Sequence, residues 1–143
     1  MSMYFIGIDI SKYKHDCCII SAANQKVVSK VIIKNNKAGF NELLTIIHSL
    51  ANPADIRIGF ESTAHYALNL ELFLENSLLT FMEVNPVLIS EYKKSKTLRR
   101  TKTDSVDCES IARWLMTVEY KPHSKGFYHA YSLKSLTRLR DKL

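Results

Sequence analysis

The sequence has few of the features that mark several common classes of protein. Its four glycines, at positions 7, 39, 59 and 126, lie too far apart to form a glycine-rich loop around phosphates. No apolar run approaches the roughly 20 residues of a membrane span, and no Cys/His spacing resembles a zinc site. These absences argue against a phosphate-binding glycine loop, a membrane-spanning protein and a zinc domain.

The amino terminus and the cysteines give an expectation about the cellular compartment. Residues 1–9 have no basic start and no cleavage site, and their apolar stretch ends at Asp9, so they predict a first strand and not a signal peptide. In a reducing cytosol, Cys17, Cys18 and Cys108 are expected to be free thiols. We therefore expect a cytoplasmic protein with no membrane partner.

The length of 143 residues fits a single domain, and its positive charge is concentrated in the last third. Residues 1–92 hold 7 Lys and Arg against 9 Asp and Glu, a net charge of −2, whereas residues 93–143 hold 13 against 5, a net charge of +8. Six cations form a basic segment: Lys93, Lys94, Lys96, Arg99, Arg100 and Lys102. We interpret this segment as a binding surface for nucleic acid, with a solvated basic face or loop as the alternative.

Apolar periodicity and turn residues predict strands and helices in a recognisable order. The first seven predicted elements are strands at 4–10, 15–21 and 26–33, a helix at 36–50, a strand at 56–60, a helix at 62–76 and a strand at 78–84. Asn85 and Pro86 then predict an N-cap and the first position of another helix. This order is that of a ribonuclease H-like fold, an α/β domain with a five-stranded mixed sheet flanked by helices.

Four carboxylates carry most of the chemical information: Asp9, Glu61, Asp104 and Asp107. Asp9 ends the first predicted strand and Glu61 ends the fourth, and these strands are expected to be neighbours in the centre of the sheet. Because an isolated buried carboxylate is costly, the convergence of several predicts a bound cation. Hard carboxylate oxygens favour Mg²⁺ or Mn²⁺, and such a site can act on phosphodiesters.

Asp104 and Asp107 allow two interpretations. At a spacing of i and i+3 they share one face of a helix, and that face continues into Ile111 and Trp114, which should pack on the sheet. Alternatively, Asp104 is an N-cap and Asp107 an acidic residue of the first helical turn. The acids at the ends of the two predicted strands favour the first interpretation, in which both residues are metal ligands.

Four motifs occur in order over about residues 3–118: Gly7-Ile8-Asp9, Phe60-Glu61-Ser62-Thr63, Asn85-Pro86 and Lys102-Thr103-Asp104-Ser105-Val106-Asp107. Together they resemble the amino-terminal domain of the DEDD transposases, the insertion-sequence recombinases related to the Piv DNA invertase. The resemblance implies the fold of the RuvC junction resolvase, with the four carboxylates as a tetrad of magnesium ligands. It also implies DNA strand cleavage and rejoining during transposition, with the target chosen by a structured guide RNA.

The resemblance further implies a longer protein. Residues 1–120 correspond to the catalytic domain, and 121–143 to the start of a helical linker to a carboxy-terminal domain that carries a nucleophilic serine. We therefore expect this chain alone to be inactive as a recombinase, and the full-length protein to be a homo-oligomer. Ala64 and Cys108 stand where the family usually has glycine and often has alanine, respectively, and both are small replacements.

Two other functions remain open on the residues alone. A non-catalytic nucleic-acid-binding module would keep the fold and the basic segment without binding metal. An actin-like or sugar-kinase ATPase also ends its first strand in Gly-x-Asp, but it needs glycine-rich turns that this chain lacks. Metal binding separates a recombinase from the first alternative, and nucleotide binding separates it from the second.

Overall fold

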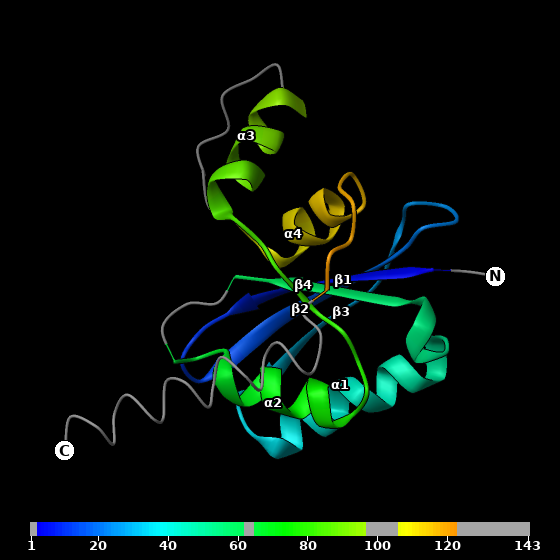
Figure 1. Ribbon diagram of the computed structural model, residues 1–143, viewed down its shortest axis with the longest axis vertical. Coiled ribbons are helices and arrows are strands. Elements are labelled where there is room, and N and C mark those ends of the chain that lie inside the picture. The colour runs from blue at the N-terminus through cyan, green and yellow to red at the C-terminus, as the bar shows by residue number, and fades with distance from the viewer. Residues whose placement is uncertain (1–2, 62–64, 97–105, 123–143) are drawn as a thin grey trace.

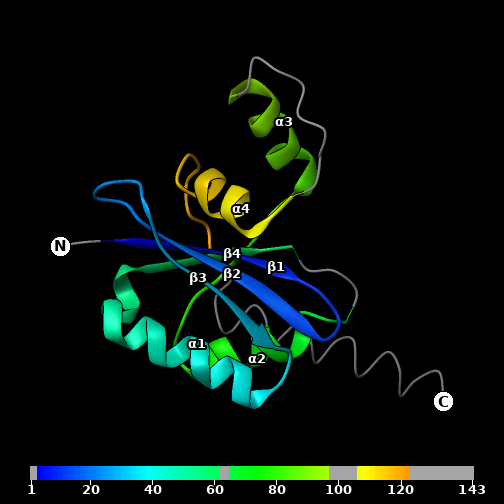
Figure 2. The same cartoon turned by 180° about the vertical axis from the view of Figure 1, so that it is seen from behind.

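A computed structural model describes residues 3–61, 65–96 and 106–122. Its elements are β1 (Tyr4–Ile10), β2 (Lys14–Ser21), β3 (Val27–Lys34), α1 (Lys37–Leu50), the 3-10 turn η1 (Pro53–Asp55), β4 (Ile56–Phe60), α2 (Leu68–Asn76), β5 (Met82–Glu83), α3 (Pro86–Lys96) and α4 (Cys108–Leu115). A central sheet separates α1 and α2 on one side from α3 and α4 on the other (Figures 1 and 2). Within the described ranges, no helix is long and apolar enough to cross a membrane.

The sheet has the strand order β3-β2-β1-β4-β5. β1, β2 and β3 form an antiparallel meander, and β4 and β5 extend it in the same direction as β1. β1 therefore lies at the centre of the sheet with both faces covered, which explains its near-continuous apolar sequence. The predicted five-stranded mixed sheet is confirmed.

Alternation along β1 divides its side chains between two cores. Ile6 and Ile8 pack with α1 and α2, where Phe40 is also buried. Phe5 points to the opposite face and packs with α3 and α4, where Trp114 is only 7% exposed, as predicted for a core residue. We call this second side of the sheet the α4 face.

Two predicted elements are shorter than expected. The helix predicted from residue 62 begins at Leu68, because residues 65–67 form a turn. Residues 62–64 lie outside the described residues. The strand predicted at 78–84 is reduced to β5, because Leu78 adopts a φ of 61° and closes the turn after α2. Leu79 and Phe81 are nevertheless buried, so the apolar run serves the core without joining the sheet.

Gly7 allows α4 to cross directly over β1. A Cβ atom at this position would lie 2.1 Å from the carbonyl oxygen of Cys108 and 2.5 Å from the amide nitrogen of Ala112. Both are backbone atoms that cannot rotate away, so any side chain would push α4 off the sheet. The glycine of the Gly-x-Asp motif thus fixes where α4 begins, close to Asp9.

Replacing Gly7 with alanine should destabilise the fold more than the same change at Gly59. The three atoms nearest to a Cβ atom at Gly59 would be side-chain carbons of Leu115 and Val84, at 3.1 to 3.2 Å, and these can shift. We expect Gly7→Ala to lower the free energy of unfolding by about 3 kcal/mol and Gly59→Ala by about 1 kcal/mol. Urea titrations followed by circular dichroism measure both losses. Equal losses would show that α4 can move away from β1 at little cost.

Candidate active site

Acidic residues of β1 and β2, and one that directly follows β4, gather at one end of the α4 face. Asp9 points to this face because it lies two residues from Gly7, over which α4 crosses. Asp16 is the direct cross-strand partner of Asp9, so the two side chains lie on the same face. Glu61 comes one step beyond the last β1–β4 pair, next to Asp9 at the carboxyl ends of these parallel strands.

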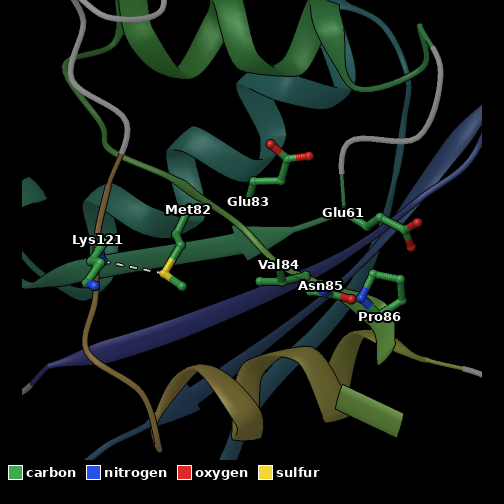
Figure 3. A pocket seen from close by; sticks show the side chains of 7 residues that line it. All are labelled: Glu61, Met82, Glu83, Val84, Asn85, Pro86 and Lys121. Carbon is green, nitrogen blue, oxygen red and sulfur yellow. Dashed lines mark hydrogen bonds between the residues drawn. The ribbon is translucent and has the colours of Figure 1, made fainter. Parts of the chain in front are cut away.

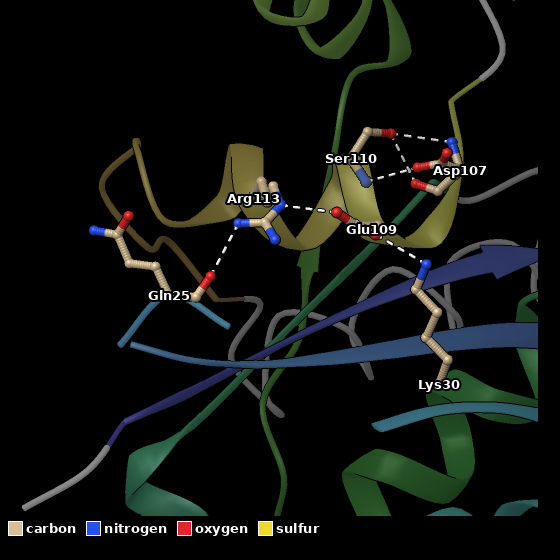
Figure 4. Close-up of polar contacts among 6 residues, drawn as sticks. All are labelled: Gln25, Lys30, Asp107, Glu109, Ser110 and Arg113. Atoms are coloured by element: carbon tan, nitrogen blue, oxygen red, sulfur yellow. Dashed lines mark hydrogen bonds and ion pairs between the residues drawn. The ribbon is translucent and has the colours of Figure 1, made fainter. Parts of the chain in front are cut away.

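Asp107 reaches the same region from α4 and is the N-cap of that helix. Its Oδ1 accepts a hydrogen bond from the amide of Ser110 at 2.7 Å, and the Oγ of Ser110 accepts one from the amide of Asp107 at 3.0 Å (Figure 4). With φ at −98° and ψ at 172°, Asp107 is extended, so it does not lie on a helical face as the i, i+3 prediction assumed. Asp107 takes the capping role considered for Asp104, which lies outside the described residues.

Burial and repulsion act together on Asp9. Its pKa is raised, first by burial and then by the negative charges of Asp16, Asp107 and Glu61. Within the described residues, Asp16 Oδ1 is buried without a hydrogen-bond partner, and no ion pair involves any of these four acids. We call Asp9, Asp16, Glu61 and Asp107 the acid cluster.

Sequence reasoning missed Asp16. The available signal was the length of the first turn: only residues 11–13 separate β1 from β2. A hairpin that pairs residues symmetrically about this turn sets Asp16 opposite Asp9. The prediction considered acids at strand ends alone, and Asp16 lies within β2.

A cavity of about 540 Å³ adjoins the acid cluster (Figure 3). It is lined by Glu61, Met82, Glu83, Val84, Asn85, Pro86 and Lys121. Figure 3 shows Glu61 beside Asn85 and Pro86, with Lys121 at the other end. The Oδ1 of Asn85 accepts a hydrogen bond from the Val87 amide at 2.9 Å, so the predicted start of α3 is confirmed. The cavity runs along β5 and reaches the carboxyl ends of β4 and β5 at Glu61 and Asn85. Ligands of open α/β sheets bind beyond such strand ends.

The acid cluster suits a divalent cation in its chemistry. Carboxylate oxygens are the donors that Mg²⁺ and Mn²⁺ prefer, and the buried, unpartnered oxygen of Asp16 is one that a cation can satisfy. Among residues 3–61, 65–96 and 106–122, however, no group of three or more His, Cys, Asp or Glu side chains is arranged to hold a metal ion. Asp104, the fourth predicted ligand, lies outside these ranges. Metal binding therefore stays a prediction.

The basic segment can be followed only into α3. This helix extends away from the sheet beyond α4 (Figures 1 and 2), and Lys93 and Lys94 lie in its second half. Arg99, Arg100 and Lys102 lie outside the described residues, and so does the side chain of Lys96. Their contact with nucleic acid stays a prediction.

The three cysteines are free thiols, as expected. Cys17 lies in the core against α1 and α2, where burial raises its pKa to about 12 and keeps the thiol protonated. Cys18 points to the α4 face, where it is buried with Ile20 and Ala112. Cys108, at the start of α4, packs against these residues. Cys108 therefore occupies space between α4 and β2, next to the acid cluster.

Comparison with known proteins identifies the family. The profile of a DEDD transposase family, described as a transposase, matches residues 6–143. The chain is 33% identical over 115 residues to the pilin gene-inverting proteins of Moraxella bovis and Moraxella lacunata; each match covers 80% of this chain and 34% of the relative. The chain thus spans about a third of the length of these relatives.

A solved structure supports the fold independently. The chain is similar to T. thermophilus RuvC in complex with a Holliday junction substrate, with a TM-score of 0.56 over 85% of this chain and 99% of that chain. At 10% identity, this likeness establishes the RuvC-like fold alone. The family profile, in contrast, spans every motif on which the resemblance rested, from Gly7 to Asp107. The chain belongs to the DEDD transposase family.

Proposed function

We propose that this chain is the catalytic domain of a transposase that cleaves and rejoins DNA strands. One observation carries the proposal: Asp9, Glu61 and Asp107 come together at the carboxyl ends of β1 and β4, beside a cavity. Family membership supports it, as does the likeness to proteins that invert a pilin gene. Because the chain spans about a third of those relatives, we assign the complete reaction to a longer protein.

In this proposal, Mg²⁺ or Mn²⁺ is held by Asp9, Glu61, Asp104 and Asp107. When bound, such ions polarise a phosphodiester and stabilise the charge that develops on its oxygens. The chain itself holds the carboxylates in place: strand pairing positions Asp9 and Glu61, and the capping box positions Asp107. Asp16 adds negative charge opposite Asp9, which favours a cation at this point.

Asp107 can cap α4 and bind metal at the same time. A carboxylate has two oxygens, and the capping hydrogen bond from Ser110 engages Oδ1. No described residue donates a hydrogen bond to Oδ2, and the side chain is exposed. The two interpretations of Asp107 are therefore compatible, with the cap fixing the carboxylate that serves as ligand.

Thermal melting with and without Mg²⁺ or Mn²⁺ tests the metal site directly. A metal that binds the folded state should raise the melting temperature of the unaltered chain, by roughly 5–10 °C at about 100 times its Kd. Asp9→Asn should abolish this shift. Without metal, the same variant should melt at or above the temperature of the unaltered chain, because it removes a buried charge from a repulsive cluster. Circular dichroism follows both transitions.

Two variants of Asp107 separate capping from metal binding. Asparagine caps helices as well as aspartate does, so Asp107→Asn should leave the metal-free stability nearly unchanged while reducing the metal-induced shift. Asp107→Ala should lose the shift and also about 1 kcal/mol of stability. A full metal-induced shift in Asp107→Asn would reduce Asp107 to a capping residue.

DNA is the proposed substrate, and the basic segment is its proposed binding surface. The RuvC structure contains a Holliday junction, which supports a nucleic-acid substrate for this fold. Lysine and arginine bind backbone phosphates without regard to sequence, so the basic segment supplies affinity and not target choice. We assign target choice to a structured guide RNA, and the complete reaction to a homo-oligomer of the longer protein.

Neutralising part of the basic segment should weaken DNA binding and flatten its salt dependence. Each lost phosphate contact lowers the slope of log K against log salt by about 0.9 on duplex DNA. We expect Lys93→Gln/Lys94→Gln to lower the slope by up to about 2, measured by fluorescence anisotropy over a salt series. Lys26→Gln/Lys37→Gln, which removes two exposed lysines outside the segment, is the matched control. Equal slopes in the two variants would place the binding surface elsewhere.

A further inference from the structure

Part of the α4 face next to the acid cluster is left uncovered by the described helices. α4 packs mainly on β1 and β2, and β3 forms the edge of the sheet beyond them. At the end of the sheet that carries the acids, Lys14 of β2 and Lys34 and Ile32 of β3 point to this face and are exposed, Ile32 by 61%. Ile32, the exposed apolar residue of this surface, lies directly opposite Asp16.

Two lysines of this surface face each other in an unfavourable arrangement. Lys14 and Lys34 are direct cross-strand partners, and like charges in such positions repel. Within the described residues, no ion pair involves either of them. Lys30, on the same face of β3, differs: its Nζ lies 2.9 Å from Glu109 Oε1 and so ties β3 to α4 (Figure 4). The exposed pair at the acid end thus lacks the anion that Lys30 has.

The turn between β1 and β2 leads directly into Lys14 and is held firmly. The amide of Asn35 donates to the carbonyl of Tyr13 at 2.8 Å, and its Nδ2 donates to the carbonyls of Lys12 at 3.0 Å and Tyr66 at 3.2 Å. Tyr13 is nevertheless 76% exposed, and the Nζ of Lys12 lies 5.2 Å from its ring centroid. The turn therefore presents an aromatic ring and a cation together on a fixed backbone.

The surface adjoins the acid cluster. Lys14 lies two residues from Asp16 on the same strand face, a separation of about 7 Å. A polyanion that meets carboxylates alone is repelled, so a strand brought to the acid cluster needs cations on either side of the point of contact. Lys14 and Lys34 supply them on the β3 side.

We propose that Lys12, Tyr13, Lys14, Ile32 and Lys34 form a surface that binds one unpaired strand of DNA beside the acid cluster. The lysines contact phosphates, Tyr13 stacks on a base, and Ile32 contacts the apolar part of a sugar or base. An exposed ring favours an unpaired strand, because its bases offer their faces for stacking. The choice of DNA as the ligand rests on the proposed function.

Binding of a fluorescent single-stranded oligonucleotide in EDTA tests the surface without metal. Lys14→Glu should weaken binding about tenfold, whereas Lys26→Glu, the same change of charge at the opposite end of the sheet, should weaken it less than about twofold. Lys26 is exposed in the β2–β3 turn and provides a matched control. Equal effects of the two reversals would overturn the proposal.

Tyr13 gives a second test, independent of net charge. Tyr13→Ser should weaken binding of the single strand by about tenfold and leave a duplex of the same sequence unaffected, while Tyr13→Phe should retain binding. Equal losses on duplex and single strand, or none on either, would refute stacking by Tyr13. Tighter binding of RNA of the same sequence, with the same sensitivity to these variants, would overturn the assignment to DNA.

The metal experiments keep this proposal distinct from the proposed function. Lys14→Glu and Tyr13→Ser leave the acid cluster and Asp104 in place, so both variants should retain the metal-induced rise in melting temperature. Loss of strand binding with an intact metal response supports the surface. A chain without any metal response that still shows the predicted Lys14 and Tyr13 effects would refute the metal site and leave the surface standing.

Discussion

The close contact between the α4 backbone and β1 at Gly7 is the constraint on which the α4 face depends. It brings the start of a helix, and with it Asp107, to the strand that carries Asp9. Strand pairing alone positions Asp9, Asp16 and Glu61. The helix crossing adds Asp107, an acid that comes from a helix and not from the sheet. A side chain at position 7 would separate these two contributions even if each element still formed.

The acid cluster destabilises the folded state, and favourable interactions elsewhere in the fold must offset this cost. Burial and three neighbouring charges raise the pKa of Asp9, and one oxygen of Asp16 is buried without a partner in the described structure. Carboxylates with perturbed pKa values are concentrated at functional sites. The favourable burial of the two cores, on both sides of β1, supplies the stability that makes this arrangement possible.

Local patterns predicted the parts of the fold that depend on local sequence. β1 and β4 have the predicted bounds, and Asn85 caps α3 as expected, because burial and capping leave direct traces in sequence. Asp16 was missed because its position depends on hairpin register. The assumption that Asp107 lies within a helix was wrong because the capping box sets the start of α4 one residue later. The crossing at Gly7 involves residues far apart in the chain, so no local pattern reveals it.

The topology places cations on both sides of the acid cluster. β3 and β5 are the two edges of the sheet, and Asp9, Asp16 and Glu61 lie on, or directly after, the strands between them. β5 leads directly into α3, which carries the first lysines of the basic segment, while Lys34 ends β3 at the other edge. Cations placed within the cluster would pair with its carboxylates and compete with a metal ion. Cations at the two edges would attract a polyanion to the cluster while leaving the carboxylate oxygens available, so this arrangement suits both parts of the proposed chemistry.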